Sequence, residues 1–333
     1  MEKKIYFLIN SLSGGGAERT MINISRFLKP EKIFLLEKEV SYPTNYLPLF
    51  FLSDHKKKTN LFLKIIFFPL FLLRLKKIIK KEDTLLSFLE KSNVLNLFLK
   101  IFLNHRALIS IRNYPSLAYR GKKIFYRFFI KFLYPKADLI IAISLGIKKD
   151  LIKNFSLKEE KIKVIYNGID FEEIEKKSKE PLEEFSFLKN KRILINVARL
   201  TKQKGQWYLL RIFKELKKDF SDLKLCILGE GELKDYLVAL SEKLRLKTFV
   251  WDRDPLSQNF DVYFLGFQKN PFKFLANSKI FLLTSFFEGL SSVVLEAMAC
   301  GLPIMSSDCQ AGPREILAPE SNIDYQTQEA EFG

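Results

Sequence analysis

Two glutamates, Glu288 and Glu296, flank a short apolar run in the segment FEGLSSVVLEAMACGLPI. Glu288 follows the strand-like run IFLLTS, and Glu296 lies in a predicted helix whose N-cap falls at Ser291 or Ser292. Because free backbone N–H groups at a helix N-terminus bind anions, we expect a phosphate at this point. Glu296 is then placed to accept hydrogen bonds from a ribose diol, and Glu288 to face the group beyond the phosphate. Phosphate, diol and a second polyol together describe a nucleotide sugar.

Paired carboxylates also suggest a second chemistry, because glycosidases use two of them to cleave a sugar linkage. The sequence spacing of Glu288 and Glu296 does not exclude a hydrolase. A glycosidase needs no phosphate-binding loop beside its carboxylates, however. The pattern therefore favours a nucleotide ligand over hydrolysis.

The elements that must position these residues alternate between strands and helices. In the first half, the run KIYFLIN leads through SLSGGGAER into a helix in which Met21, Ile24 and Leu28 recur at helical spacing. Further strand-like runs in this half are KIFLLE, ALISIR, DLIIAIS and KVIYN. The alternation starts again with RILINVAR and continues through LKLCILGEG, FDVYFLGF, IFLLTS and LPIMSSD. We therefore expect an α/β protein with two doubly wound domains, each built on a parallel sheet.

A polar, charged segment separates the two series. It reads NGIDFEEIEKKSKEPLEEF and covers residues 167–185. It sets the predicted domains at residues 1–167 and 168–333, facing each other across a cleft. After GPREIL the pattern offers no closing strand or helix, so we expect the second domain to be incomplete at its C-terminus.

Several motifs, in order along the chain, resemble one enzyme family. SLSGGGAER is similar to its N-terminal glycine loop, YPKADLIIAIS and VIYNGID to its inter-domain approach, and NVARLTKQKG to its basic motif. ILGEGELKD and VYFLGF resemble its next two strand ends, and FEGLSSVVLEAMACGLPI its Glu-x7-Glu region. The family is that of the retaining glycosyltransferases of family 4, whose fold, called GT-B, has two Rossmann-like domains. SGGGAER with GPREIL most resembles bacterial enzymes that add sugars to lipid-linked oligosaccharides, O-antigens and capsules.

The resemblance implies a role for each motif residue of the second domain. Arg199 and Lys204 would bind the donor diphosphate, Glu296 the ribose, and Glu288 a hydroxyl of the donor sugar. Two cations and a helix terminus would stabilise the charge that develops on the leaving diphosphate, so no metal or other cofactor is required. Arg199, Lys204 and Glu288 form the expected catalytic set.

Loop residues are expected to contact the substrates through their backbone or small side chains. Glycines in the first loop let the backbone approach the diphosphate or the acceptor closely. The strand ends GEG and GF resemble the loops on the nucleobase side of the family. The residues expected in these contacts are Gly14, Gly15, Gly16, Gly229, Glu230, Gly266, Phe267, Gly289, Leu290 and Ser291.

The acceptor side departs from the family pattern. Many members place a histidine at the mouth of the cleft, where ALISIRNYPS offers Arg112 and Asn113 instead. Both histidines of the chain, His55 and His105, lie outside that motif. We expect Arg112 or Asn113 to take the acceptor-side role. The run Asp252–Asp254 has the Asp-x-Asp spacing of metal-dependent glycosyltransferases, which have another fold, and we interpret it as a coincidence.

The composition is globular and strongly basic. Lys and Arg number 55 against 38 Asp and Glu, a net charge of +17, and the 333 residues include 32 Phe. A basic surface attracts nucleic acid, anionic lipid or phosphorylated small molecules, although codon bias explains such an excess equally well. No nucleic-acid recognition motif accompanies the charge, so nucleic acid is not an expected partner.

One segment, KKKTNLFLKIIFFPLFLLRLKKIIKKE at residues 56–82, combines basic flanks with Phe and Leu. It is too short and too interrupted to span a bilayer, and it resembles an interfacial segment that binds anionic headgroups. An ordinary core helix is the alternative. The N-terminus does not resemble a signal peptide, and three cysteines without ligand spacing fit a reducing cytoplasm. We expect a cytoplasmic protein at the inner face of the membrane.

These features predict an enzyme of one class. We expect a retaining hexosyltransferase that moves a hexose or N-acetylhexosamine, from a nucleotide diphosphate donor that is UDP-linked, to a lipid-linked glycan. One alternative is a nucleotide-sugar epimerase, which shares the fold and donor but has no use for a lipid-facing segment. Another is an inactive fragment that only associates with membranes.

Overall fold

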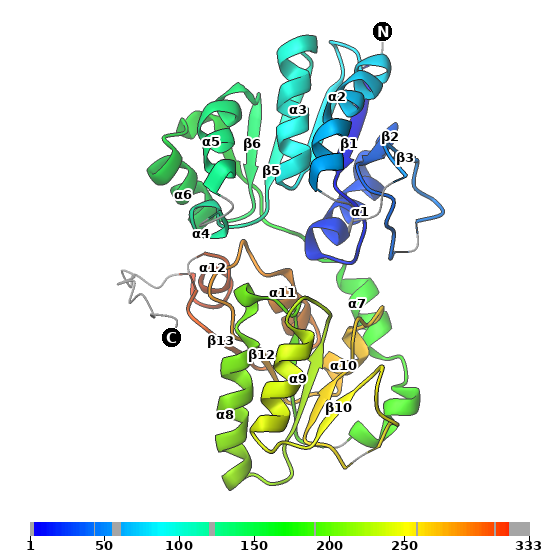
Figure 1. The fold of residues 1–333 in the computed structure, drawn as a ribbon, viewed down its shortest axis with the longest axis vertical. Helices are drawn as coiled ribbons and strands as arrows, with labels where there is room; N and C mark the ends of the chain where they lie inside the picture. Colours follow the sequence, from blue (N-terminus) through cyan, green and yellow to red (C-terminus); the bar gives the residue numbers. More distant parts are fainter. Residues whose placement is uncertain are drawn as a thin grey trace.

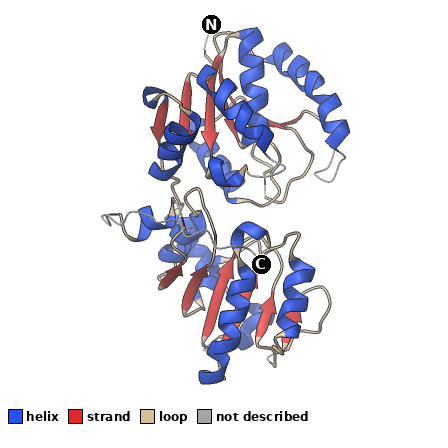
Figure 2. Cartoon of the chain, turned by 60° about the vertical axis from the view of Figure 1, so that its left-hand side comes forward, coloured by secondary structure: helices blue, strands red, loops and turns tan. Residues whose placement is uncertain are grey.

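The computed structural model describes residues 3–42, 44–54, 61–119, 124–189, 191–257, 259–309 and 311–319. The chain forms two α/β domains stacked along the long axis of the molecule (Figure 1). Each domain contains one sheet whose strands are all parallel, with helices covering both of its faces (Figure 2). The two doubly wound Rossmann-like domains that the sequence predicts are confirmed.

The first domain has a seven-stranded sheet in the order β3-β2-β1-β4-β5-β6-β7. Its strands are β1 Ile5–Ile9, β2 Lys32–Leu35, β3 Leu49–Phe51, β4 Thr84–Phe88, β5 Arg106–Ile111, β6 Leu139–Ala142 and β7 Ile162–Val164. Its helices are α1 Gly16–Leu28, α2 Leu61–Ile78, α3 Glu90–Leu103, α4 Pro115–Ala118, α5 Ile124–Leu133 and α6 Leu145–Phe155, with 3-10 turns η2 Tyr134–Lys136 and η3 Glu159–Lys161.

The second domain has a six-stranded sheet in the order β10-β11-β9-β8-β12-β13. Its strands are β8 Ile193–Val197, β9 Lys224–Leu228, β10 Thr248–Val250, β11 Val262–Phe264, β12 Ile280–Leu283 and β13 Ile304–Ser306. Its helices are α7 Phe171–Ser178, α8 Gln206–Asp219, α9 Lys234–Lys243, α10 Phe272–Ala276, α11 Ser292–Ala299 and α12 Pro313–Leu317, with 3-10 turns η4 Glu183–Leu188 and η5 Lys202–Lys204.

The segment between the sheets contains the predicted boundary. The first sheet ends with β7 at Val164, and α7 already packs against α10 and α11 of the second domain. The Asp170 side chain caps α7 by accepting a hydrogen bond of 2.9 Å from the Glu173 backbone N–H. The boundary expected at residues 167 and 168 therefore falls in the connector that precedes α7.

Three strands, β3, β4 and β10, were not predicted from the sequence. β4 (TLLSF) directly precedes the apolar helix α3, so the two elements form one unbroken apolar stretch in which strand and helix periods cannot be separated. β3 and β10 have only three residues each, too few to display any period. Because β4 pairs with both β1 and β5, it occupies the centre of the first sheet.

Helices α2, α3 and α5 of the first domain expose a group of large apolar side chains. Aromatic rings join the three helices, with centroids 5.3 Å apart for Phe68 and Phe98 and 6.2 Å apart for Phe98 and Phe129. We call the outer surface of these helices the aromatic face. Its side chains are between 43% and 65% exposed, and they are Leu70, Leu73, Ile101, Phe102, Ile124, Phe125, Phe128 and Phe132.

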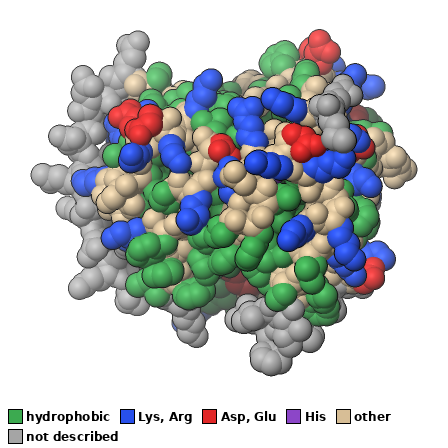
Figure 3. Space-filling view, turned by 90° about the horizontal axis from the view of Figure 1, so that it is seen from above, with side chains coloured by type: hydrophobic (Ala, Val, Ile, Leu, Met, Phe, Trp, Pro, Cys, Tyr) green, Lys and Arg blue, Asp and Glu red, His purple; other side chains and the backbone are tan. Residues whose placement is uncertain are grey.

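The segment 56–82 contributes only part of this face. Residues 56–60 lie outside the described residues, and α2 buries Phe71 and Leu75 in the domain core while it exposes Leu70 and Leu73. Helix α2 thus contributes to the domain core, as the core-helix alternative expects, and membrane binding by this segment stays a prediction. Figure 3 looks down on the first domain and shows hydrophobic side chains interspersed with Lys and Arg. Among the described residues, no helix combines the length and apolar character needed to cross a membrane.

Candidate functional site

The carboxyl ends of the two sheets face each other, so the loops that leave the strands meet between the domains. Gly14, after β1, is so close to Phe267, after β11, that an added Cβ would lie 3.0 Å from the phenyl ring. Gly289, after β12, is closer still, because its Cβ would lie 2.2 Å from the backbone oxygen of Arg112. In parallel α/β sheets, ligands bind beyond the carboxyl ends of the strands. The candidate site lies at this junction.

Lys204 and Glu288 form a buried ion pair at the end of two adjacent strands. Lys204 lies in η5 after β8, and Glu288 in the loop after β12; because β8 and β12 pair, residues 84 positions apart come into contact. Their side chains are 13% and 7% exposed. The same Glu288 oxygen accepts a hydrogen bond of 2.6 Å from the Ser285 hydroxyl. The two residues expected on phosphate and sugar are therefore brought together.

Further hydrogen bonds hold these two loops in register. The Gln203 side-chain amide donates to the Phe287 carbonyl at 2.8 Å, and the Thr284 hydroxyl donates to the Lys204 carbonyl at 2.8 Å. Gly205 adopts a positive φ of 63°, and an added Cβ would meet the Thr284 carbonyl oxygen. The loops that carry Lys204 and Glu288 are thus held together by hydrogen bonds and close packing.

Arg199 occupies a different environment from Lys204. It follows β8 directly, and its side chain is exposed. In the part of the chain that the structure describes, the Arg199 guanidinium makes no hydrogen bond or ion pair, while its backbone carbonyl accepts one from the Gln206 amide at 3.0 Å. Arg199 is consequently a cation that a ligand can reach without displacing a protein partner.

The N-terminus of α11 begins beside this pair. Ser291 occupies the predicted N-cap position, but it adopts a left-handed φ of 66° and its side chain makes no capping bond. Its buried Oγ has no partner among the described residues. A strained, unpaired polar residue of this kind is typical of binding sites. Ser292 instead accepts a hydrogen bond of 2.9 Å from Asn167, which belongs to the VIYNGID motif.

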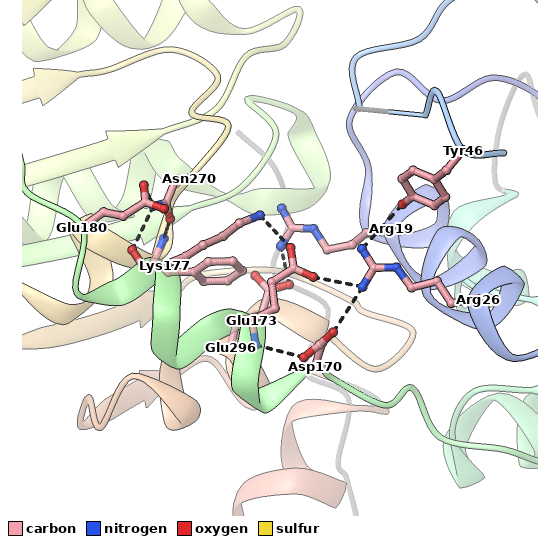
Figure 4. Close-up of polar contacts among 10 residues, drawn as sticks. Arg19, Arg26, Tyr46, Asp170, Glu173, Lys177, Glu180, Asn270 and Glu296 are labelled. Carbon is pink, nitrogen blue, oxygen red and sulfur yellow. Dashed lines mark hydrogen bonds and ion pairs between the residues drawn. The ribbon is translucent and has the colours of Figure 1, made fainter.

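Glu296 bonds to a residue of the first domain. Its Oε1 atom accepts a hydrogen bond of 2.6 Å from Arg19 Nη1, and the ion pair spans the domain junction (Figure 4). Burial raises the pKa of Glu296, and the Arg19 charge opposes that rise. Sequence reasoning missed Arg19 and Ser285. The signal for Arg19 was its place directly after the glycine loop, in SLSGGGAER.

A second polar bridge joins the domains nearby. Arg26 of α1 donates to Asp170 and Glu173 of the α7 region, at 3.2 Å in both cases, and reaches the Tyr46 hydroxyl (Figure 4). Lys177 pairs with the same Glu173 carboxylate at 2.6 Å. Helix α1 therefore contacts the second domain through two arginines, seven residues apart, on one side of the helix.

The predicted nucleobase-side loops lie at adjacent strand ends. Gly229, after β9, has a positive φ of 134°, and an added Cβ would lie 2.1 Å from the Ala198 carbonyl oxygen. Gly266, after β11, packs in the same manner against the Trp251 indole. Glu230 is exposed, and Phe267 is 37% exposed beside Gly14. The backbone path here tolerates no larger residue at either glycine.

The remaining loop residues belong to the loops that meet at the junction. Gly15 is the N-cap of α1, and Gly16 is its first residue. Leu290 is buried and packs into the core of the first domain although it belongs to the second. The Gly15 carbonyl accepts a hydrogen bond of 3.0 Å from Tyr42. The glycine loop is therefore fixed on its own domain while it faces the other.

Arg112 and Asn113, expected on the acceptor side, differ in burial. Arg112 is only 8% exposed, and its guanidinium carbon lies 5.8 Å from the centre of the Phe88 ring. Asn113 is half-buried beside the Tyr119 hydroxyl. Of the two histidines, His55 is outside the described residues, and His105 is buried at a hydrogen-bond distance of 2.8 Å from Asn96. His105 is thus a core residue.

The two aspartates of the Asp-x-Asp run pair with basic side chains. Asp252 pairs with Lys234, and Asp254 pairs with Arg253 at 3.0 Å. Within the described ranges, no three His, Cys, Asp or Glu side chains come close enough to hold a metal ion. Both aspartates therefore have structural partners.

Comparisons with known proteins agree with this geometry. The family described as Glycosyltransferase Family 4 matches residues 14–173, and the family described as Glycosyl transferases group 1 matches residues 177–326. Each match covers one of the two domains. Together they cover the junction described above from both sides.

Two relatives share a large part of the sequence. An N-acetylgalactosamine-N,N'-diacetylbacillosaminyl-diphospho-undecaprenol 4-alpha-N-acetylgalactosaminyltransferase of Campylobacter jejuni is 35% identical over 327 residues, 96% of this chain and 84% of that enzyme. An uncharacterized glycosyltransferase of Methanocaldococcus jannaschii is 38% identical over 255 residues, 73% of this chain and 60% of that protein.

A solved structure has the same fold. HepE of Anabaena, crystallised with UDP and glucose, superposes with a TM-score of 0.74 at 20% identity, over 92% of this chain and 81% of that protein. The two-domain arrangement is thus the GT-B fold. From the family matches, the Campylobacter relative and this fold, the chain belongs to family 4 of the glycosyltransferases and is a transferase enzyme.

Proposed function

We propose that this glycosyltransferase moves a hexose or N-acetylhexosamine from a UDP-linked sugar to a lipid-linked glycan, with retention of configuration at the anomeric carbon. The observation that carries the proposal is the buried Lys204–Glu288 pair beside the N-terminus of α11. The name of the Campylobacter relative supports the acceptor class, because it describes transfer onto a glycan carried by diphospho-undecaprenol. The HepE complexes support UDP as the nucleotide.

In the proposed mechanism, the acceptor hydroxyl attacks the anomeric carbon on the same face that the diphosphate leaves. The bond between that carbon and the phosphate oxygen breaks, the new glycosidic bond forms, and the acceptor proton passes to the departing oxygen. Lys204 and Arg199 stabilise the negative charge that develops on the diphosphate. This chemistry uses the cations of the chain itself and requires no metal ion.

The Lys204–Glu288 pair fits these roles through partner exchange. When a donor binds, Lys204 takes a phosphate oxygen, and Glu288 turns its carboxylate toward a sugar hydroxyl while Ser285 continues to hold it. A buried charge must keep a partner, because its removal from water is otherwise too costly. Without ligand, each of the two buried charges therefore serves as the partner of the other, and both already lie where the substrate is proposed to bind.

Membrane contact belongs to the same proposal. The aromatic face offers apolar side chains on three adjacent helices, and neither α2 nor α5 contains an acidic residue. Phe and Leu inserted at the acyl boundary, together with Lys and Arg near anionic headgroups, bind a membrane surface. We infer a peripheral location on the cytoplasmic side of the membrane, through residues 56–82 and helix α5.

A product assay tests the function. The purified 333-residue chain is incubated with UDP-glucose, UDP-galactose and their N-acetyl forms, with and without a polyprenyl-diphosphate-linked glycan. Mass spectrometry should detect one added sugar on the lipid-linked glycan only when donor and acceptor are both present. Conversion of the donor sugar without an acceptor would favour the epimerase alternative.

A folded chain that binds neither UDP nor GDP and transfers no sugar would favour the inactive-fragment alternative. Titration of UDP into the protein, alongside Glu296→Ala and Lys204→Ala, separates binding from turnover. Saturable binding that both substitutions weaken would support the nucleotide position in the second domain.

A further inference from the structure

Arg112 presents a buried guanidinium edge that no described residue satisfies. The side chain is 8% exposed, and its Nη1 atom makes one long hydrogen bond of 3.4 Å to the Ser110 hydroxyl. The Nε and Nη2 atoms are buried and have no hydrogen-bond partner among the described residues. Native proteins satisfy nearly all buried donors, and an unpaired guanidinium is among the most costly exceptions.

The two unsatisfied atoms lie on the same edge of the guanidinium group. Nε–H and one Nη2–H point in parallel directions and form the fork that binds the two oxygens of a carboxylate or a phosphate. The Phe88 ring at 5.8 Å and the bond to Ser110 hold the plane of the group. The fork is therefore preorganised before any ligand arrives.

The group remains a cation in this environment. Burial lowers the pKa of Arg112 to about 10, still well above neutral pH, and the Glu18 charge opposes the shift. Glu18 lies near enough to act through its charge, but it does not bond Nε or Nη2. Arg112 is thus charged, and the Nε and Nη2 atoms of its guanidinium have no hydrogen-bond partner among the described residues.

The position of Arg112 connects this edge to the substrate. The residue directly follows β5 at the carboxyl end of the first sheet, and its backbone oxygen contacts Gly289, the residue after Glu288. The first domain therefore places a cation against the loop of the second domain that is proposed to hold the donor sugar. Arg112 therefore lies where the two domains meet.

We propose that Arg112 binds an oxyanion of the substrate through its Nε and Nη2 atoms. The inference rests on the proposed function, since it names a charged group on a ligand of that site. Two sources carry this chemistry: the diphosphate of the donor, and the carboxylate of an acidic sugar in the acceptor glycan. The shared feature is a planar pair of oxygens that accepts two parallel hydrogen bonds.

The test compares charged probes with neutral matches on the full chain. UDP is titrated against uridine, and glucuronate against glucose, with the unsubstituted protein and with Arg112→Gln. Arg112→Gln should weaken one charged probe at least about tenfold, the effect of losing a bidentate charged pair, and leave its neutral match unchanged. Loss of UDP binding identifies the diphosphate, and loss of glucuronate binding identifies an acidic sugar.

Arg127→Gln is the matched control, because Arg127 also lies over a phenyl ring, that of Phe155, but donates to the Ser116 carbonyl at 3.1 Å. It should alter neither probe. The proposal is wrong if the unsubstituted protein prefers neither charged probe over its match, or if Arg112→Gln leaves that preference undiminished. Failure of the proposed function has another signature: the unsubstituted chain then transfers no sugar, whatever Arg112 binds.

A second readout separates a ligand-binding role from a structural one. Arg112→Gln removes an unpaired buried charge, so the melting temperature without ligand should stay the same or rise. A clear fall would mean that the guanidinium stabilises the fold, and would overturn the assignment. Arg112→Lys keeps the charge without the fork, and it should recover only part of the lost affinity.

Discussion

The two domains share one architecture but differ in how they treat polar and apolar groups. At the junction, the second domain pairs its own charges, Lys204 with Glu288, while the first domain leaves the Arg112 fork unsatisfied. On the outer surface, the first domain gathers eight exposed large apolar side chains on the adjacent helices α2, α3 and α5. The second domain exposes fewer on its helices α8 and α9, among them Ile212 and Tyr236. The same fold thus carries a buried charge pair in one domain and an exposed aromatic face in the other.

Replacement of Lys204 should have the largest effect. Lys204→Ala removes a cation next to the proposed leaving group, and we expect the transfer rate to fall by roughly 10²- to 10³-fold, as when one stabilising donor is lost elsewhere. Lys202→Ala is the control, since Lys202 is an exposed lysine of the same 3-10 turn. Equal losses from both would contradict a specific role for Lys204.

A second control separates the loss of stability in Lys204→Ala from the loss of catalysis. Lys204→Ala leaves a buried carboxylate uncompensated, which lowers stability by itself. The double variant Lys204→Ala/Glu288→Gln restores neutrality. Thermal unfolding of both variants then separates a folding defect from a catalytic one.

The contact between the domains can be broken by a single methyl group. A Cβ at residue 289 would lie 2.2 Å from the Arg112 backbone oxygen, which cannot move aside as a side chain can. Gly289→Ala should therefore hold the domains apart and reduce turnover by about 10²-fold, the effect of a displacement of roughly 1 Å in a site. UDP affinity should fall less than turnover, because most of the residues proposed to bind the nucleotide belong to the second domain.

Gly168→Ala in the connector is the matched substitution, since its added Cβ would meet no atom within 4 Å. Steady-state kinetics on both variants decides the matter. Normal turnover by Gly289→Ala would mean that catalysis does not need the observed approach of the domains.

The outer surfaces of the domains give a third test. Phe125, Phe128 and Phe132 of α5 are 65%, 57% and 55% exposed. Their combined replacement by Ser should reduce binding to anionic vesicles at least about tenfold, since each partly buried phenyl ring contributes on the order of 1 kcal/mol. Co-sedimentation with vesicles of phosphatidylglycerol measures the effect.

The same number of apolar residues can be changed on the other domain. Ile212, Phe220 and Tyr236, replaced by Ser, should leave vesicle binding intact. If the two triple variants lose the same amount, the aromatic face is not the membrane-binding surface and the contrast between the domains fails.

As the pH falls, the stability of the first domain should decrease before that of the second, because both histidines of the chain lie in the first domain. Burial lowers the pKa of His105 to about 4, with Lys100 adding to the shift and Asp138 opposing it. Between this value and the ordinary pKa of about 6.5, the unfolded chain binds more protons, so stability falls as the pH falls. We expect a loss of about 2 kcal/mol between pH 7 and pH 5.

His105→Gln should flatten this slope, because the amide can still donate to the Asn96 oxygen that now contacts His105 Nε2. Urea unfolding at the two pH values measures it. If the dependence of the unfolding free energy on pH is unchanged in His105→Gln, groups other than His105 cause the loss of stability in acid.

The sequence predicted the second domain in more detail than the first, for a physical reason. Lys204, Glu288 and Ser291 lie on loops fixed by paired strands, so a motif in the sequence corresponds to one place in space. Arg19 acts across the junction, and only the packing of two domains reveals its contact with Glu296. The aromatic face likewise depends on which side of α5 packs inward, which its apolar sequence IFYRFFIKFL does not fix.

The Arg19–Glu296 pair has a consequence for how the enzyme would sense its donor. We expect nucleotide affinity and domain closure to be thermodynamically linked, because Arg19 of the first domain bonds Glu296, the residue proposed to bind the ribose. If domain closure raises the donor affinity by a given factor, donor binding raises the equilibrium constant for closure by the same factor, because linkage is reciprocal. The second domain expressed alone would then be a weaker nucleotide binder than the same residues in the intact chain, although every motif residue that it contributes would still be present.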